Sequence, residues 1–289
     1  MDTTTFLWTL AATLFAGIQL FLQKIVAHER RDAAFSGMMM YGISGVLAFG
    51  ILIFYPWPSQ WLVIGAFGLG AGTVHSFGNY LRIQSLKNID SVIYFPLNKL
   101  LGPLIVVIGG LAFFHDPLTV REYIGIALSL TVPLFLLSAA ENHRQRNLRY
   151  GLILLVVSTA LTSASPIFSK AGLAYAPAVL FMVAVSQVAG TFWSTLILFR
   201  QKGLANMVAH IERRDMWLGL WIGLIGFVSY FTLLKALSTG LISIVYVIQA
   251  HYILIPIALS VWWYREHINT RKVVAIIVSL LAIGILYQV

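Results

Sequence analysis

Among the residues that could take part in chemistry, Lys99 lies deepest inside an apolar stretch of the chain. It lies about two turns into the segment 91–113, where an ammonium group surrounded by hydrocarbon is costly. Such a group should face a cavity, where it could hold the carboxylate or phosphate of a solute or carry a proton. The competing interpretation is structural, with Lys99 bonded to backbone carbonyls that Pro96 or Pro103 leaves exposed.

A second polar group follows the helical repeat of the segment 60–86. His75, Asn79 and Arg82 are spaced i, i+4 and i+7, so all three would lie on one helix face, which should point away from lipid. Arg82 offers a planar fork suited to a carboxylate, while its position near the segment end equally favours snorkelling to the headgroups. His75 could titrate near neutral pH or serve as a hydrogen-bonded packing residue.

Tyrosines and amides supply most of the remaining candidates. Tyr94, Tyr230, Tyr246 and Tyr252 fall in the segments 91–113, 215–236 and 241–263. A cage of such rings could bind a quaternary ammonium such as choline, although the intramembrane lysine argues against a cationic ligand. The complete predicted substrate-binding set comprises Gln19, His75, Asn79, Arg82, Tyr94, Asn98, Lys99, Tyr230, Tyr246, Gln249, His251 and Tyr252.

The sequence also restricts the chemistry that is available. No Asp or Glu lies well inside an apolar segment, whereas an exporter of cationic drugs by proton exchange needs such a carboxylate. The absence of cysteine excludes disulfides, thiolate chemistry and Cys-ligated zinc, and no glycine-rich phosphate loop or His-Glu-x-x-His motif occurs. We therefore predict no catalytic residue, no metal and no cofactor. An intramembrane enzyme or a non-transporting membrane receptor is the alternative from another functional class.

Ten apolar stretches must position the candidate residues. Hydrophobic residues make up 59% of the 289-residue chain and charged residues 10%, far from the balance of a soluble domain. Each stretch approaches the roughly 20 residues that cross a bilayer as a helix, and a lipid-facing backbone must satisfy its own hydrogen bonds. The sequence therefore predicts an all-α polytopic membrane protein. The predicted spans are 4–27, 34–54, 60–86, 91–113, 121–139, 150–170, 178–199, 215–236, 241–263 and 271–288.

The ten stretches form two repeats of five, which we place at residues 1–140 and 149–289. Chance alignment of apolar sequence would match apolar residues freely, but not charges and prolines in one order. Because five spans per half is an odd number, the two copies face opposite ways across the membrane, as in carriers that work by alternating access around a midplane site. The aligned positions include Lys24 with Lys170, Arg82 with Lys235, Asn98 with His251 and Pro103 with Pro256.

Lys and Arg gather at the odd-numbered connections between the spans, while the even-numbered side carries only Arg121, Lys170 and Lys235. By the positive-inside rule, this asymmetry places the odd connections in the cytoplasm and both termini outside. The rule also accounts for the net charge of +9 without nucleic acid as a partner. We expect a multi-pass protein of the cell membrane whose partners are the lipid bilayer and a small-molecule metabolite.

The stretches 111–119 and 261–268 resemble the signature of EamA-type proteins in the drug/metabolite transporter superfamily, in which a long apolar helix is followed by an acidic residue and a further helix. The stretch 94–100 is similar to the start of the fourth helix in some bacterial members. The resemblance covers the whole chain. It implies transport of a small organic solute, since members export amino acids, import choline or exchange sugar phosphates and nucleotide sugars. Asp116 replaces the usual Glu, and many relatives are described with cytoplasmic termini, opposite to the charge pattern.

These observations together predict a secondary active transporter of a small anionic or zwitterionic metabolite, such as an amino acid, that works by alternating access. A quaternary amine held in an aromatic cage is the alternative substrate. Proton coupling through His75, His251 or Lys99 is a further hypothesis, because the predicted spans hold no embedded carboxylate.

Overall fold

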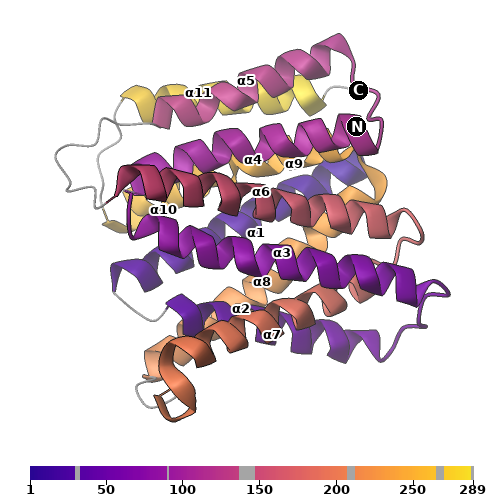
Figure 1. The fold of residues 1–289 in the computed structure, drawn as a ribbon. Helices are drawn as coiled ribbons and strands as arrows, with labels where there is room; N and C mark the ends of the chain where they lie inside the picture. The colour runs from indigo at the N-terminus through magenta and orange to yellow at the C-terminus, as the bar shows by residue number, and fades with distance from the viewer. Residues whose placement is uncertain (30–32, 90, 137–146, 207–211, 265–269, 288–289) are drawn as a thin grey trace.

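The computed structural model describes residues 1–29, 33–89, 91–136, 147–206, 212–264 and 270–287, which form helices without a β-strand (Figure 1). Nine of the described helical stretches are long and apolar enough to cross a membrane, and α5, with 17 residues, is only slightly shorter. The predicted all-α polytopic membrane fold is confirmed. The helices are α1 (Thr3–His28), α2 (Ala33–Leu52), α3 (Trp61–Leu86), α4 (Ser91–Phe113), α5 (Val120–Leu136), α6 (Leu148–Leu173), α7 (Val179–Asn206), α8 (Arg213–Thr239), α9 (Ile242–Ala250), the 3-10 turn η1 (His251–Ile253), α10 (Leu254–Tyr264) and α11 (Thr270–Tyr287).

The predicted ninth span, 241–263, is not one helix but is divided into α9, η1 and α10. Pro256 has no N–H to donate to the carbonyl of Tyr252, one helical turn earlier, so the α-helical ladder is interrupted where η1 lies. Pro166, by contrast, lies inside the continuous helix α6. Residues 137–146, where the predicted repeats meet, and residues 265–269, which include the end of the stretch 261–268, lie outside the described residues.

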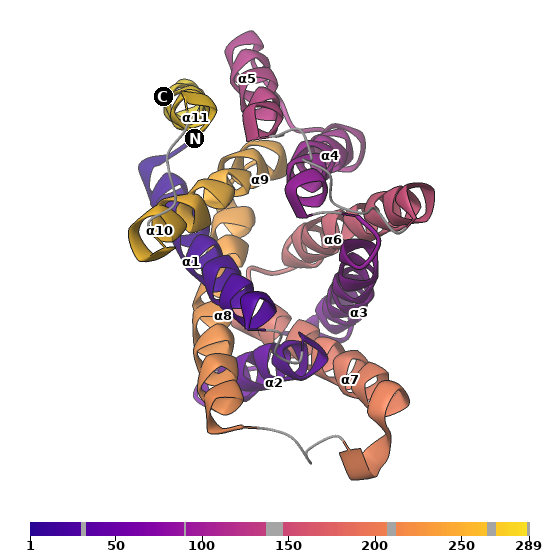
Figure 2. The same cartoon turned by 90° about the vertical axis from the view of Figure 1, so that its left-hand side faces the viewer.

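The two halves of the chain interleave. Each described helix makes its most extensive contacts with a helix of the other half: α1 packs on α8, α3 on α6, and α5 on α11. Figure 2 shows α3 beside α6 and α1 beside α8 around the centre of the bundle. The repeats are therefore units of sequence that complete each other's packing.

Corresponding helices of the two halves also meet each other. α2 contacts α7, α4 contacts α9, and α5 contacts α11, while the crossed pairs α1–α8 and α3–α6 are equivalent when the halves are exchanged. This pattern is what a twofold axis between inverted repeats produces, because a helix that contacts its own repeat mate must lie against that axis. We refer to it as the pseudo-twofold axis.

Small residues allow the crossed helices to approach closely. A Cβ on Gly78 of α3 would lie 2.6 Å from Thr162 Cγ2 and 3.0 Å from the Thr162 backbone nitrogen in α6. A Cβ on Gly72 would collide with the backbone carbonyl of Ser186 in α7. Helices in a membrane associate through such van der Waals contact, because lipid provides no hydrophobic driving force between them.

The bundle has two distinct ends (Figure 1). The terminal end holds both chain termini and the turns 53–60, 114–119, 174–178 and 240–241. The basic end lies opposite and holds the other ends of the described helices, with most of the described Lys and Arg residues near it. A solute crossing the bundle must pass both ends, so the contacts that hold each end matter for function.

Side chains bond to backbone across the terminal end. Lys170 Nζ on α6 donates hydrogen bonds to the carbonyls of Leu237, at 2.6 Å, and Gly240, at 2.9 Å, where α8 ends. Asp116 Oδ2 accepts a hydrogen bond of 2.9 Å from the backbone N–H of Ser243, where α9 begins. A cation thus caps one helix C-terminus and an anion caps the next N-terminus, as the helix dipoles favour.

Candidate solute-binding cavity

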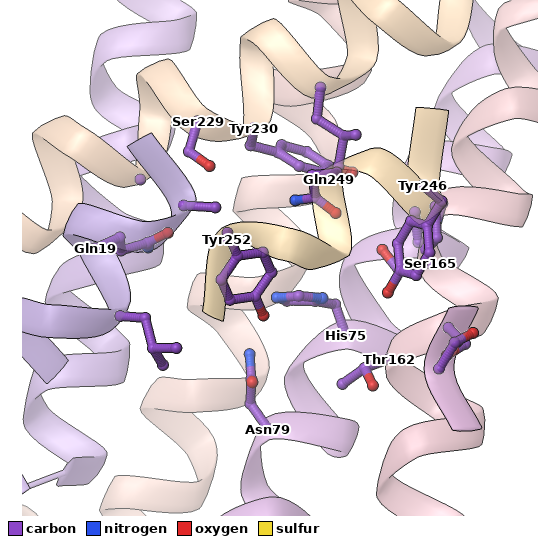
Figure 3. A pocket seen from close by; sticks show the side chains of 18 of the residues that line it. Gln19, His75, Asn79, Thr162, Ser165, Ser229, Tyr230, Tyr246, Gln249 and Tyr252 are labelled. Atoms are coloured by element: carbon purple, nitrogen blue, oxygen red, sulfur yellow. The ribbon is translucent and has the colours of Figure 1, made fainter. Parts of the chain in front are cut away.

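A polar cavity of about 170 Å³ lies in the middle of the bundle (Figure 3). Residues from α1, α2, α3, α4, α6, α7, α8, α9 and η1 line it, so both halves contribute to its walls. A cavity of about 150 Å³ is known to hold benzene, and this one therefore has room for a solute of roughly six to ten non-hydrogen atoms. That size matches a small metabolite.

Most of the residues predicted from the sequence lie along this cavity. Tyr94 and His251 are outside the described lining: the buried Tyr94 hydroxyl is 2.9 Å from Ser158 Oγ, and His251 Nδ1 is 3.0 Å from the carbonyl of Val247. These two buried side chains therefore lie in the layer behind the cavity wall. The predicted residues that line the cavity are Gln19, His75, Asn79, Arg82, Asn98, Lys99, Tyr230, Tyr246, Gln249 and Tyr252, and their role in binding stays a prediction.

The predicted stripe on α3 faces the cavity. Asn79 Nδ2 donates a hydrogen bond to the Tyr41 hydroxyl, and the His75 ring packs edge-on against the same tyrosine with ring centroids 5.9 Å apart. Arg82 Nη2 lies 3.5 Å from Gln23 Oε1 on α1, where the lining comes closest to the basic end. The helical spacing of this stripe therefore puts three polar side chains on one wall, at increasing distance from the terminal end.

Lys99 reaches the cavity from α4 and meets Tyr252 of η1. Its ammonium donates a hydrogen bond to the Tyr252 hydroxyl and lies 3.9 Å from the centroid of the same ring. The 3-10 turn before Pro256 carries Tyr252, and Figure 3 shows its ring directed toward His75 and Asn79. The lysine is thus held by a neutral phenol, which supplies an acceptor oxygen and an aromatic face without a compensating charge.

The charges of the cavity are of one sign. Arg82 and Lys99 are cations, and none of the described lining residues is an Asp or Glu. Asp116 is the one buried acid among the described residues, and it belongs to the terminal end. No group of three His, Asp or Glu side chains suited to a metal occurs in the described part of the chain. Because low-dielectric walls strengthen the field of a charge, these two cations act on the cavity without an opposing acid among its described lining residues.

The predicted set omits Gln23, Tyr41 and Gln187, which also line the cavity. Tyr41 and Gln187 have the same spacing in the sequence as Lys24 and Lys170, so each is the repeat mate of the other. Polar residues at matching positions of two apolar spans are the signal that could have found this pair. Neither side chain stands out when its own span is considered alone.

A model of the EamA-like transporter family matches the chain twice, over residues 3–138 and 149–288. The fold is similar to that of a solved protein described as "Crystal structure of protein", with a TM-score of 0.74 over 99% of this chain and 97% of that chain. The two sequences are 14% identical, so this likeness concerns the fold alone. No curated protein matches the chain significantly in sequence.

Proposed function

Because the chain belongs to the EamA-like transporter family, we propose that its central cavity binds a small anionic or zwitterionic metabolite, such as an amino acid, and moves it by secondary active transport with alternating access. The chain is a multi-pass integral membrane protein of a family that transports small solutes. We propose the cell membrane as its location.

The observation that carries the proposal is the charge of the cavity. Lys99 and Arg82 line it, and the described lining residues include no carboxylate to neutralise them. The acidic group of a solute would provide that negative charge. A carboxylate adds the attraction between opposite charges to its hydrogen bond with an ammonium, so an anion has the advantage over a neutral solute of the same shape.

Other lining groups suit the remainder of a zwitterionic solute. The side-chain oxygens of Gln19 and Gln249 are acceptors that could take hydrogen bonds from a solute ammonium, and the rings of Tyr230 and Tyr246 offer negative faces. A quaternary amine is less well supported, because the ring of Tyr252 already lies 3.9 Å from the ammonium of Lys99. That cation would repel a second one placed beside the same ring.

Proton coupling is part of the same proposal. With no carboxylate among the described lining residues, the groups through which a proton could be coupled are His75 and Lys99 on the cavity wall, and His251 behind it. Uptake driven by an imposed pH gradient in liposomes would support this coupling. Uptake that is unchanged when the gradient is collapsed would contradict it.

Counterflow in liposomes tests the transport proposal directly. Purified full-length protein would be reconstituted with an excess of unlabelled L-alanine, L-lactate, succinate, inorganic phosphate or choline inside, and the same compound labelled outside. We expect transient accumulation of at least one anionic or zwitterionic probe, and Lys99→Met should abolish it. Accumulation of choline alone, with Lys99→Met still active, would move the function to a quaternary amine. Protein-free liposomes are the control for leakage.

A further inference from the structure

We propose that Tyr252 determines the specificity of the cavity: its hydroxyl holds the position on Lys99 that the acidic group of the solute requires, and the solute must displace it to bind. This inference rests on the proposed function, because it assumes an anionic or zwitterionic solute. It assigns the tyrosine a competing role in place of a direct contact with the solute.

Lys99 and Tyr252 occupy equivalent positions in the two halves of the chain. Lys99 and Tyr252 are 153 residues apart, the same spacing that relates Arg82 to Lys235 in the aligned repeats. They are therefore repeat mates. Lys99 belongs to α4 and Tyr252 to η1, which directly follows α9, and α4 and α9 lie against the pseudo-twofold axis. Two mates that touch each other must lie on that axis, so the Lys99 ammonium and the Tyr252 hydroxyl mark it at the level of the cavity.

The geometry of inverted repeats keeps a contact on the axis in the same place when access switches. When the two halves exchange their shapes to switch access, residues far from the axis move from one arrangement to the other, while a contact on the axis keeps its depth. The Lys99–Tyr252 contact is thus available to a solute in either arrangement. Arg82 lies nearer the basic end, and its mate Lys235 is not among the described lining residues, so these two cations do not share this property.

Tyr252 and the solute compete for the ammonium of Lys99. Tyr252 accepts one of the three N–H donors of Lys99, and its ring covers one side of the same group. A neutral solute would replace the phenol oxygen of Tyr252 by an acceptor of similar strength and would gain little binding free energy. A carboxylate or phosphate oxygen adds the attraction of its negative charge for the ammonium, which the neutral phenol lacks, and can therefore displace the hydroxyl. Tyr252 thereby sets a threshold that favours acidic solutes.

Removal of the hydroxyl alone tests this role, because Phe keeps the ring. Binding of L-alanine, L-lactate, succinate and inorganic phosphate to the purified full-length protein would be measured by titration calorimetry. We expect Tyr252→Phe to bind the probe that the wild type binds about three- to tenfold more tightly, since a net hydrogen bond no longer has to be broken. Tyr252→Met removes the same hydroxyl and serves if the Phe variant does not fold.

Tyr123→Phe is the matched control, because Tyr123 is 47% exposed on α5 and lies outside the described cavity lining. Its dissociation constants should equal those of the wild type. Unchanged or weaker binding by the folded Tyr252 variants would overturn the inference, and weaker binding would mean that the hydroxyl contacts the solute directly. The proposed function fails separately if Lys99→Met binds every probe as the wild type does, or if no probe binds the wild type or either Tyr252 variant.

Discussion

The terminal end and the basic end of the bundle are held by different kinds of contact. At the terminal end, Lys170 and Asp116 bond to backbone groups where α8 ends and α9 begins. At the basic end, an ion pair between Arg214 and Glu29 joins α8 to α1, with the arginine side chain 61% exposed. Exposed ion pairs contribute about 0–1 kcal/mol, whereas backbone groups that lose a partner in a membrane cost several-fold more.

The two ends also differ in how closely the cavity approaches them. The described cavity lining extends to Arg82 and Gln23, within about one and a half turns of the basic end of α3 and α1. Toward the terminal end, the Tyr230 hydroxyl meets Ser169 Oγ at 3.0 Å, and the bonds of Lys170 lie beyond this contact. Among the described residues, these contacts therefore lie between the cavity and the terminal end, while the cavity lining approaches the basic end.

Gly110→Ala should break this asymmetry most strongly. The added Cβ would collide with Ser243 Oγ and lie 2.8 Å from Asp116 Oδ2, so α4 would be pushed from the start of α9. We expect unfolding to become easier by about 2–3 kcal/mol, with a lower melting temperature. Because the chain has no native cysteine, Ser165→Cys in the cavity wall can report access, and its labelling from the terminal side by an impermeant maleimide should increase.

Gly37→Ala is the matched control near the basic end, since a Cβ there meets no atom within 4 Å in the described residues. It should leave labelling unchanged and raise the helix propensity of α2 slightly. Equal losses of stability in the two variants would remove the distinction between the ends.

Lys170→Met should have the next largest effect. Methionine has a similar length but no donor, so the carbonyls of Leu237 and Gly240 would lose their hydrogen bonds. We expect a loss of about 2 kcal/mol of stability and greater labelling of the Ser165→Cys reporter from the terminal side. A melting temperature and labelling rate equal to those of the parent would show that these bonds do not hold the terminal end.

Arg82→Gln probes the other end with a smaller effect. The positive charge near the basic end would be lost while a donor for Gln23 remains, and water and salt partly screen this position. We expect the dissociation constant of an anionic probe to rise roughly three- to tenfold, with most of the change disappearing at high ionic strength. A loss as complete as that of Lys99→Met would place the two cations in one site.

Arg214→Gln should have the smallest effect of the four. The exposed pair with Glu29 is screened by solvent, so we expect at most about 0.5 kcal/mol of lost stability and unchanged labelling of the reporter from both sides. Thermal unfolding at low and high salt measures this contribution. A large opening of the basic end in this variant would show that the ion pair acts as a gate.

Much of the fold could be predicted because lipid leaves few choices. A span of roughly 20 apolar residues has to be helical, so the ranges follow from hydropathy alone. The break of the ninth span at η1 could not be predicted from the sequence in the same way. Pro166 and Pro256 look alike in the sequence, but a proline interrupts a helix only where neighbouring groups do not satisfy the freed carbonyl, and this depends on tertiary packing.

The cavity was partly predictable for a similar reason. A polar side chain in the middle of a span has to avoid lipid, which selects Lys99, Asn79 and Gln249 without knowledge of the neighbours. The same rule cannot distinguish a cavity wall from the layer behind it, where Tyr94 lies. The contact of Lys99 with Tyr252 required the packing of two repeat mates, which no single span encodes.

The interleaved packing constrains the biosynthesis of the protein. The main partners of α1, α2 and α3 are α8, α7 and α6, all of which are made later. At about 5–20 residues per second, translation of the second half takes roughly 7–30 s. During that time α1, α2 and α3 must stay inserted without these partners, with the glycine faces of α3 covered only by lipid, whereas α4 and α5 have each other as neighbours. Assembly then proceeds backwards along the chain, because α6 emerges first and joins α3, and α8 emerges later and joins α1.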